Sequence, residues 1–210
     1  MKHRFPGMIQ WLTISSVCFF LAVQVFYHAS ALALSIAFLD QTDPIRNISF
    51  VLGSLFFLTV EILFAGAVFG LFMSAYQCEV LRQVGVKPKV WLLATMVGAV
   101  GTYGFFVYAQ FLRAYLTGLS TLFDPSLLQC IISAVVISIG QWHVFYRFKL
   151  RSNLWVATTI VALGAAIFGA YALRHTFVWA LIANMAIAVI YSALLYRGLL
   201  QLRLQRSIVI

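Results

Sequence analysis

The chain has 210 residues, of which 63% are hydrophobic and 9% are charged, and its mean hydropathy is +1.00. This composition excludes a soluble globular domain and predicts a polytopic membrane protein. The net charge of +9 would suggest nucleic acid as the partner of a soluble protein, but here the basic residues cluster at the ends of apolar runs. We therefore expect a lipid bilayer, and no nucleic acid, as the partner of this chain.

Six apolar runs follow one another along the chain, separated by short polar segments. A helix of about 20 residues crosses a hydrocarbon core about 30 Å thick, so each run is long enough to span a membrane. We expect an all-α bundle of six transmembrane helices that forms one membrane domain over residues 1–210. The predicted spans are about 8–39, 48–77, 90–112, 126–146, 154–172 and 177–196.

The first span follows a basic amino terminus that contains Lys2 and Arg4. A secretory signal peptide is an alternative, because Ala29-Ser30-Ala31 resembles a cleavage site after a basic start. The apolar run continues past this site to Leu39, however, so we interpret it as a retained span.

Turn signals separate the following spans. Asp43 and Pro44 predict a helix cap followed by proline at the first helical position of the second span, and Asp124-Pro125 repeats this pattern before the fourth. Gly85 and Pro88 punctuate a basic turn before the third span.

The basic residues fall mainly on one side of this six-span arrangement. The other side has Arg46, Arg113 and Arg174, together with three aspartates. Because basic residues are retained on the cytoplasmic side, we expect both termini in the cytoplasm, with a bacterial inner membrane as the simplest case. The residues assigned to the cytoplasmic side are Lys2, Arg4, Arg82, Lys87, Lys89, Arg147, Lys149, Arg151, Arg197, Arg203 and Arg206.

Tryptophans near the span ends suggest interfacial belts. Trp11, Trp91 and Trp155 fall at the predicted cytoplasmic ends, and Trp179 falls at the other end. Aromatic side chains of this kind often lie at the level of the lipid headgroups.

Small residues at four-residue spacing predict the faces along which the helices pack. Gly66 and Gly70 mark such a face in the second span, and Ala94 and Gly98 mark one in the third. The corresponding residues are Ala162, Ala166 and Ala170 in the fifth span and Ala180, Asn184, Ala188 and Ser192 in the sixth.

The two halves of the chain show a faint similarity. Residues 65–72 (AGAVFGLF) resemble residues 164–171 (GAAIFGAY), and the matches keep the same order in both halves. With three spans in each half, a duplication would produce an inverted three-plus-three repeat, as in many transporters. Chance similarity between apolar helices is the alternative.

Glu61 is the leading candidate for function, because it is the one charge within residues 48–77. An ionised carboxylate at the centre of a bilayer costs at least ~2.5–3.5 kcal/mol, so Glu61 is expected to face protein or water. Other polar side chains fall at similar depth in the predicted spans. These are Gln24, Tyr103, Asn184 and the region of Ser133 and Ser138.

Gln24 and His28 lie four residues apart and therefore on one face of the first helix. Together with Glu61, Tyr103 and Asn184 they form the predicted site for a solute or ion. A carboxylate among amides and hydroxyls is typical of proton- or cation-coupled transport. The alternative is that a protonated Glu61 hydrogen-bonds a neighbouring helix and has a structural role.

Other kinds of chemistry are disfavoured. A haem held by His28 and His175 would need both ligands at one depth, and intramembrane catalysis would need a second acid beside Glu61. The three cysteines lack metal-ligand spacing, so no metal and no cofactor are expected. Two hypotheses remain: a small permease with Glu61 as the coupling residue, and a non-catalytic membrane subunit, sensor or assembly factor that acts through a partner. An oligomeric assembly, either a homo-oligomer or a larger membrane complex, would favour the second hypothesis, whereas a closed polar cavity around Glu61 would favour the first.

Overall fold

A computed structural model describes residues 7–38, 48–117, 124–150 and 153–209 of the chain. Within these ranges the chain forms six α-helices and no strands. The helices are α1 (Met8–Phe38), α2 (Ile48–Gln83), α3 (Pro88–Thr117), α4 (Leu127–Arg147), α5 (Asn153–Ala172) and α6 (Phe177–Val209). All six are long and apolar enough to cross a membrane. The prediction of an all-α, multi-pass membrane protein with six spans is confirmed.

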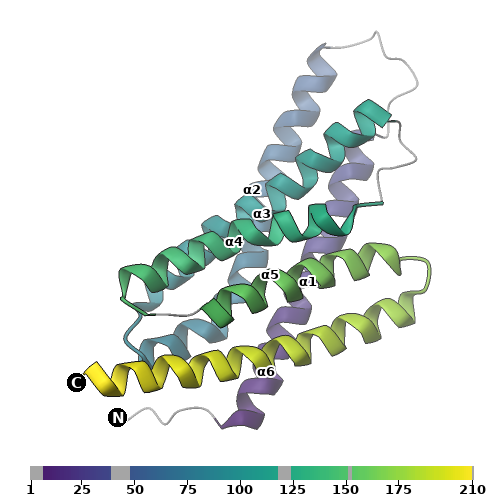
Figure 1. The fold of residues 1–210 in the computed structure, drawn as a ribbon. Coiled ribbons are helices and arrows are strands. Elements are labelled where there is room, and N and C mark those ends of the chain that lie inside the picture. The colour runs from purple at the N-terminus through teal and green to yellow at the C-terminus, as the bar shows by residue number, and fades with distance from the viewer. Residues whose placement is uncertain (1–6, 39–47, 118–123, 151–152, 210) are drawn as a thin grey trace.

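The helices form a closed ring of neighbours. Each helix packs against the next along the chain, α6 packs back against α1, and α1 also contacts α3 and α5. Figure 1 shows α4, α5 and α6 lying flatter than the steep α1 and α2 and crossing them. The ring is compatible with an inverted repeat, but any six antiparallel helices packed in order would give the same neighbours. The repeat therefore stays a prediction.

The start of α1 and the end of α6 lie at one end of the bundle, together with the two basic turns (Figure 1). We call this the basic end. At the first of these turns Gly85 adopts φ +85°, and Val86 N–H donates to the carbonyl of Leu81 over 3.1 Å. This glycine ends α2 in a left-handed conformation, and Pro88 begins α3. Both turn predictions are confirmed here, whereas Asp43 and Pro44 lie outside the described residues.

Three helices extend beyond the predicted spans. α2 continues to Gln83, α3 covers Pro88–Thr117, and α6 continues to Val209 where the sequence predicted a tail after residue 196. Leu195, Leu199 and Leu202 of α6 are fully buried. Their spacing of three to four residues places them on one helix face, so packing against the bundle extends this helix past the apolar run.

Close packing of α2, α3 and α4 depends on glycines at the predicted positions. A Cβ atom at Gly66 would lie 2.6 Å from Cα of Val100, and one at Gly70 would lie 2.7 Å from Cα of Met96. A Cβ atom at Gly98 would lie 2.8 Å from Cα of Ile137 on α4. These backbones approach too closely for any side chain, as is typical of small-residue packing in membranes. The predicted contact faces of the second and third spans are confirmed.

The small-residue face of α6 packs against α1. Ala188 and Ser192 are buried, and the Ser16 hydroxyl of α1 donates to the Ala188 carbonyl over 3.3 Å. On α5, Ala162, Ala166 and Ala170 are also buried. The predicted faces of these two helices are therefore confirmed as well.

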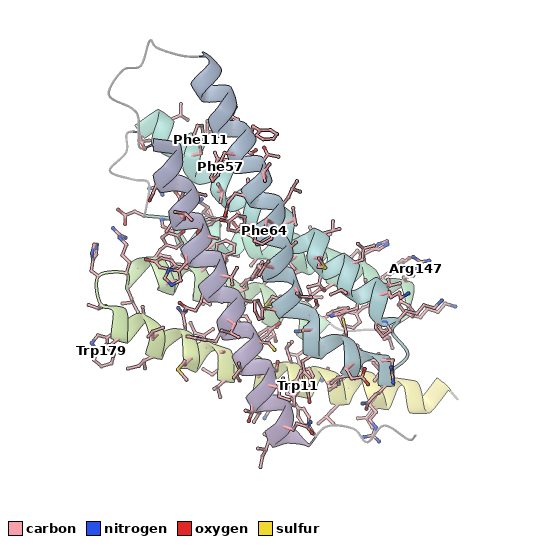
Figure 2. All side chains as sticks on the ribbon, turned by 180° about the vertical axis from the view of Figure 1, so that it is seen from behind. Trp11, Phe57, Phe64, Phe111, Arg147 and Trp179 are labelled. Carbon is pink, nitrogen blue, oxygen red and sulfur yellow. The ribbon has the colours of Figure 1, made fainter. Side chains whose placement is uncertain are left out.

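The interfacial prediction for three tryptophans is wrong. Trp11, Trp91 and Trp155 are each 0% exposed, whereas Trp179 is 64% exposed at the opposite end of the bundle (Figure 2). Trp155 packs edge-on against Trp91 with ring centroids 5.8 Å apart, and Trp11 Nε1 donates to the Ser192 carbonyl over 2.8 Å. These large rings fill the interior of the basic end instead of facing lipid headgroups, because the helices converge there.

Candidate functional site

Glu61 of α2 is paired with Tyr103 of α3. The Tyr103 hydroxyl donates a hydrogen bond of 2.6 Å to Glu61 Oε1, and Tyr103 is fully buried. Gly104, the next residue of α3, lies against Ile62, the next residue of α2: a Cβ there would come 3.1 Å from Ile62 Cγ2. The close approach of the two helices therefore brings the predicted carboxyl and phenol together.

The second carboxyl oxygen of Glu61 is unpaired in the described part of the chain. Oε2 is buried, and it has no hydrogen-bond partner among the described residues. A buried oxygen without a partner is costly, and an acid with one uncommitted oxygen can accept a proton or a cation. The Tyr103 hydroxyl thus orients the carboxyl through Oε1, and Oε2 is left to bind a proton or a cation.

Glu61 does not lie at the middle of the longer α2. The middle of α2 falls between Ala65 and Gly66, four to five residues after Glu61. At about 1.5 Å per residue, Glu61 lies about 7 Å along the axis from the helix centre, toward the end opposite the basic end. The predicted span ended six residues earlier, at Gln77, so Glu61 fell nearer to its middle. The depth of Glu61 in a bilayer stays a prediction.

Three of the other predicted residues meet in a pocket. Gln24 and His28 of α1 and Asn184 of α6 line a cavity of about 30 Å³. The remaining lining residues are Tyr27, Ala170, Arg174, Ala180 and Leu181. We call this the α1–α6 pocket. Because one water molecule needs about 10–15 Å³ by this measure, the space holds about two water molecules or a small ion.

An ion pair lies beside the α1–α6 pocket. Arg174 Nη1 donates to Asp124 Oδ1 over 2.8 Å and to the Tyr171 carbonyl over 3.1 Å. Arg113 Nη1 donates to the backbone carbonyl of Asp124 over 2.6 Å. The prediction that Asp124 caps α4 is wrong, because the cap is Ser126, whose hydroxyl accepts from Gln129 N–H over 3.2 Å. Asp124 instead joins the α3, α4 and α5 ends opposite the basic end.

An aromatic layer lies between the Glu61–Tyr103 pair and the α1–α6 pocket. Phe26 contacts the ring of Tyr103 at 5.2 Å and that of Phe106 at 5.0 Å, measured between ring centroids. Phe106 contacts Tyr171, which contacts the pocket residue Tyr27 at 5.0 Å. The five predicted site residues therefore form two groups. Glu61 and Tyr103 are one group, the three pocket residues are the other, and aromatic rings connect them.

Tyr171 was not predicted as a site residue. It is buried, its hydroxyl is hydrogen-bonded to that of Ser30, and it lies near enough to Glu61 for an electrostatic interaction. The sequence carried a weak signal for it, since a buried tyrosine in an apolar span needs a hydrogen-bond partner. That its partners come from α1 was not visible in the sequence. Ser133 and Ser138 were predicted to lie at the same depth as Glu61. Their hydroxyls donate to backbone carbonyls of their own helix.

A second polar cluster lies between the site and the basic end. Gln77 Nε2 donates to the Tyr191 hydroxyl over 3.2 Å, and the Thr159 hydroxyl donates to Gln141 Oε1 over 3.3 Å. All four side chains are buried. Gln77 Oε1 and Gln141 Nε2 find no hydrogen-bond partner within the described part of the chain. This cluster was missed because Gln77 was taken as the end of a span.

Metal binding has no support from the described side chains. In residues 7–38, 48–117, 124–150 and 153–209, no group of three or more His, Cys, Asp or Glu residues could hold a metal ion. His28 lines the α1–α6 pocket, whereas His175 is exposed in the turn between α5 and α6.

Comparisons with known proteins give no family for this chain. No protein-family model matches it, no curated protein matches it, and no solved structure matches it. The geometry of the Glu61–Tyr103 pair and of the α1–α6 pocket is therefore the basis for a functional proposal.

Proposed function

We propose that the protein is a small permease that moves a small solute or cation across a membrane, with Glu61 as the proton-coupling residue. The observation that carries this proposal is the buried Oε2 of Glu61, which has no partner within the described residues although Tyr103 holds Oε1 in place. A carboxyl within a membrane span marks an ion or substrate pathway more often than a structural contact.

The surroundings of Glu61 support a coupling role. In the described residues the titratable groups that approach it are Tyr103, at hydrogen-bond distance, and Tyr171. Neither is a basic side chain that would hold the carboxyl permanently ionised. In the proposed cycle, Glu61 Oε2 accepts a proton from one side of the membrane and releases it to the other.

The alternative is a membrane subunit or assembly factor that acts through a partner. α2 exposes Phe56, Phe57 and Phe64, and Phe64 is labelled on this helix in Figure 2. Such a face suits lipid as well as a partner protein. It therefore favours neither hypothesis, and a flux measurement is needed to separate them.

The test is chemical modification of purified wild-type protein in liposomes. A hydrophobic carbodiimide adds to a protonated carboxylic acid, so we expect it to label Glu61 and to abolish proton flux driven by a pH gradient. Glu79 and Asp124, whose side chains are 49% and 57% exposed, serve as controls for a water-soluble carbodiimide, which should leave flux unchanged.

Mass spectrometry locates the label, and a pH-sensitive dye inside the liposomes follows the flux. The proposal fails if folded wild type shows no flux above protein-free liposomes. It fails equally if flux survives complete labelling of Glu61.

A further inference from the structure

The lining of the α1–α6 pocket contains a positive charge and several hydrogen-bond donors but no negative charge. Its lining includes a guanidinium, two side-chain amides, a phenol and an imidazole, and none of the eight lining residues is a carboxylate. Arg174 supplies five N–H donors and no acceptor, and both amides can donate as well. Such a lining favours an acceptor-rich ligand, because Arg174 carries the one formal charge among the lining residues.

Asn184 shows that the pocket has hydrogen-bonding capacity to spare. Its side chain is 2% exposed, yet Oδ1 has no partner among the residues described. As it stands, Oδ1 is an acceptor that a donor such as water would satisfy. An anion would instead accept a hydrogen bond from the NH₂ group of the same side chain, after rotation of the amide where needed.

Arg174 can bind a ligand by exchanging one of its present contacts, of which the ion pair with Asp124 is the most accessible. The Asp124 side chain is 57% exposed, and such partly exposed ion pairs are weak. An anion in the pocket would therefore compete with Asp124 for the guanidinium.

We propose that the α1–α6 pocket binds a small monovalent anion, either the carboxylate of a short organic acid or an inorganic ion of similar size. The volume of about 30 Å³ sets the size limit. This inference rests on the proposed permease function, to which it adds the substrate class. The proton bound at Glu61 Oε2 accompanies the anion, so that one negative and one positive charge cross together.

Equilibrium binding in detergent tests the pocket without any flux measurement. Radiolabelled acetate and chloride are the probes for the two anion sources, and methylammonium is the cation control. We expect saturable binding of one or both anions, with no binding of methylammonium. We expect Arg174→Gln to weaken anion binding at least about tenfold, because it removes the charge-assisted hydrogen bonds.

Asp124→Asn separates anion binding from a structural ion pair. If Asp124 competes with the ligand, this variant binds the anion more tightly, whereas Arg174→Gln binds it more weakly. If the pair only holds the helix ends together, both variants change binding in the same direction, which would overturn the proposal.

Two further variants guard against misfolding and against a general charge effect. Gln24→Leu removes a pocket amide without changing the charge, so we expect weaker binding from it as well. Arg113→Gln removes a positive charge at the same end but outside the pocket, so we expect unchanged binding. The proposal is overturned if folded wild type binds neither anion, if methylammonium binds, or if Arg113→Gln has the same effect as Arg174→Gln. Loss of anion binding with proton flux intact would leave the coupling role of Glu61 standing.

Discussion

Replacing Glu61 by glutamine is expected to reduce proton flux in liposomes to the level of protein-free membranes while the bundle still folds. Glutamine has nearly the same shape, and its carbonyl oxygen can accept the hydrogen bond that Tyr103 now donates to Oε1. We therefore expect the free energy of unfolding to change by about 1 kcal/mol or less. The amide cannot take up a proton, so coupling is lost.

Two companion variants separate titration from packing. Glu61→Asp keeps the acid but shortens its reach to Tyr103, so partial flux is expected. Tyr103→Phe keeps the acid and leaves Oε1 without its donor, which should cost about 1–3 kcal/mol of stability with flux reduced but measurable. Full flux in a folded Glu61→Gln protein would contradict the coupling role.

Replacing Gly70 by leucine is expected to cause the largest loss of stability among these changes. A Cβ at this position meets Cα of Met96 at 2.7 Å and Cβ of Ala99 at 2.8 Å, so α2 and α3 would have to separate along their whole contact. Overpacking against backbone should cost about 3 kcal/mol, at the upper end for such changes. Thermal unfolding in detergent measures the loss.

Gly53→Leu is the matched control, because it makes the same substitution in the same helix. A Cβ at Gly53 has no heavy atom within 4 Å, so this variant should unfold at the wild-type temperature. Equal unfolding temperatures for the two variants would show that α2 and α3 do not depend on close approach at Gly70.

The span number and the contact faces could be predicted because both depend on local properties. Hydropathy and charge define each span, and glycines such as Gly66 and Gly98 mark where backbones meet. Span ends were less predictable. α6 passes residue 196 because Leu199 and Leu202 find a surface to bury against, and that surface comes from other helices.

The candidate site could be predicted only in part, for a similar reason. The four-residue spacing of Gln24 and His28 correctly places them together, and Asn184 follows from the small-residue face of α6. The separation of this pocket from Glu61 depends on where Phe26 and Phe106 lie, which is a property of the packed bundle. The buried tryptophans were misplaced because a residue's height along a helix does not determine the face on which it lies.

The most direct test of the account is infrared spectroscopy of the carboxyl groups while the reconstituted protein is titrated from alkaline to acidic pH. Comparing wild type with Glu61→Gln and Glu79→Gln isolates the signal of Glu61. All five Asp and Glu residues add to the carboxylic-acid band on acidification. We expect one component of that band to be present in wild type and in Glu79→Gln and to be missing in Glu61→Gln. Identical spectra for wild type and Glu61→Gln would show that Glu61 does not change its protonation, and the proton-coupling role would be wrong.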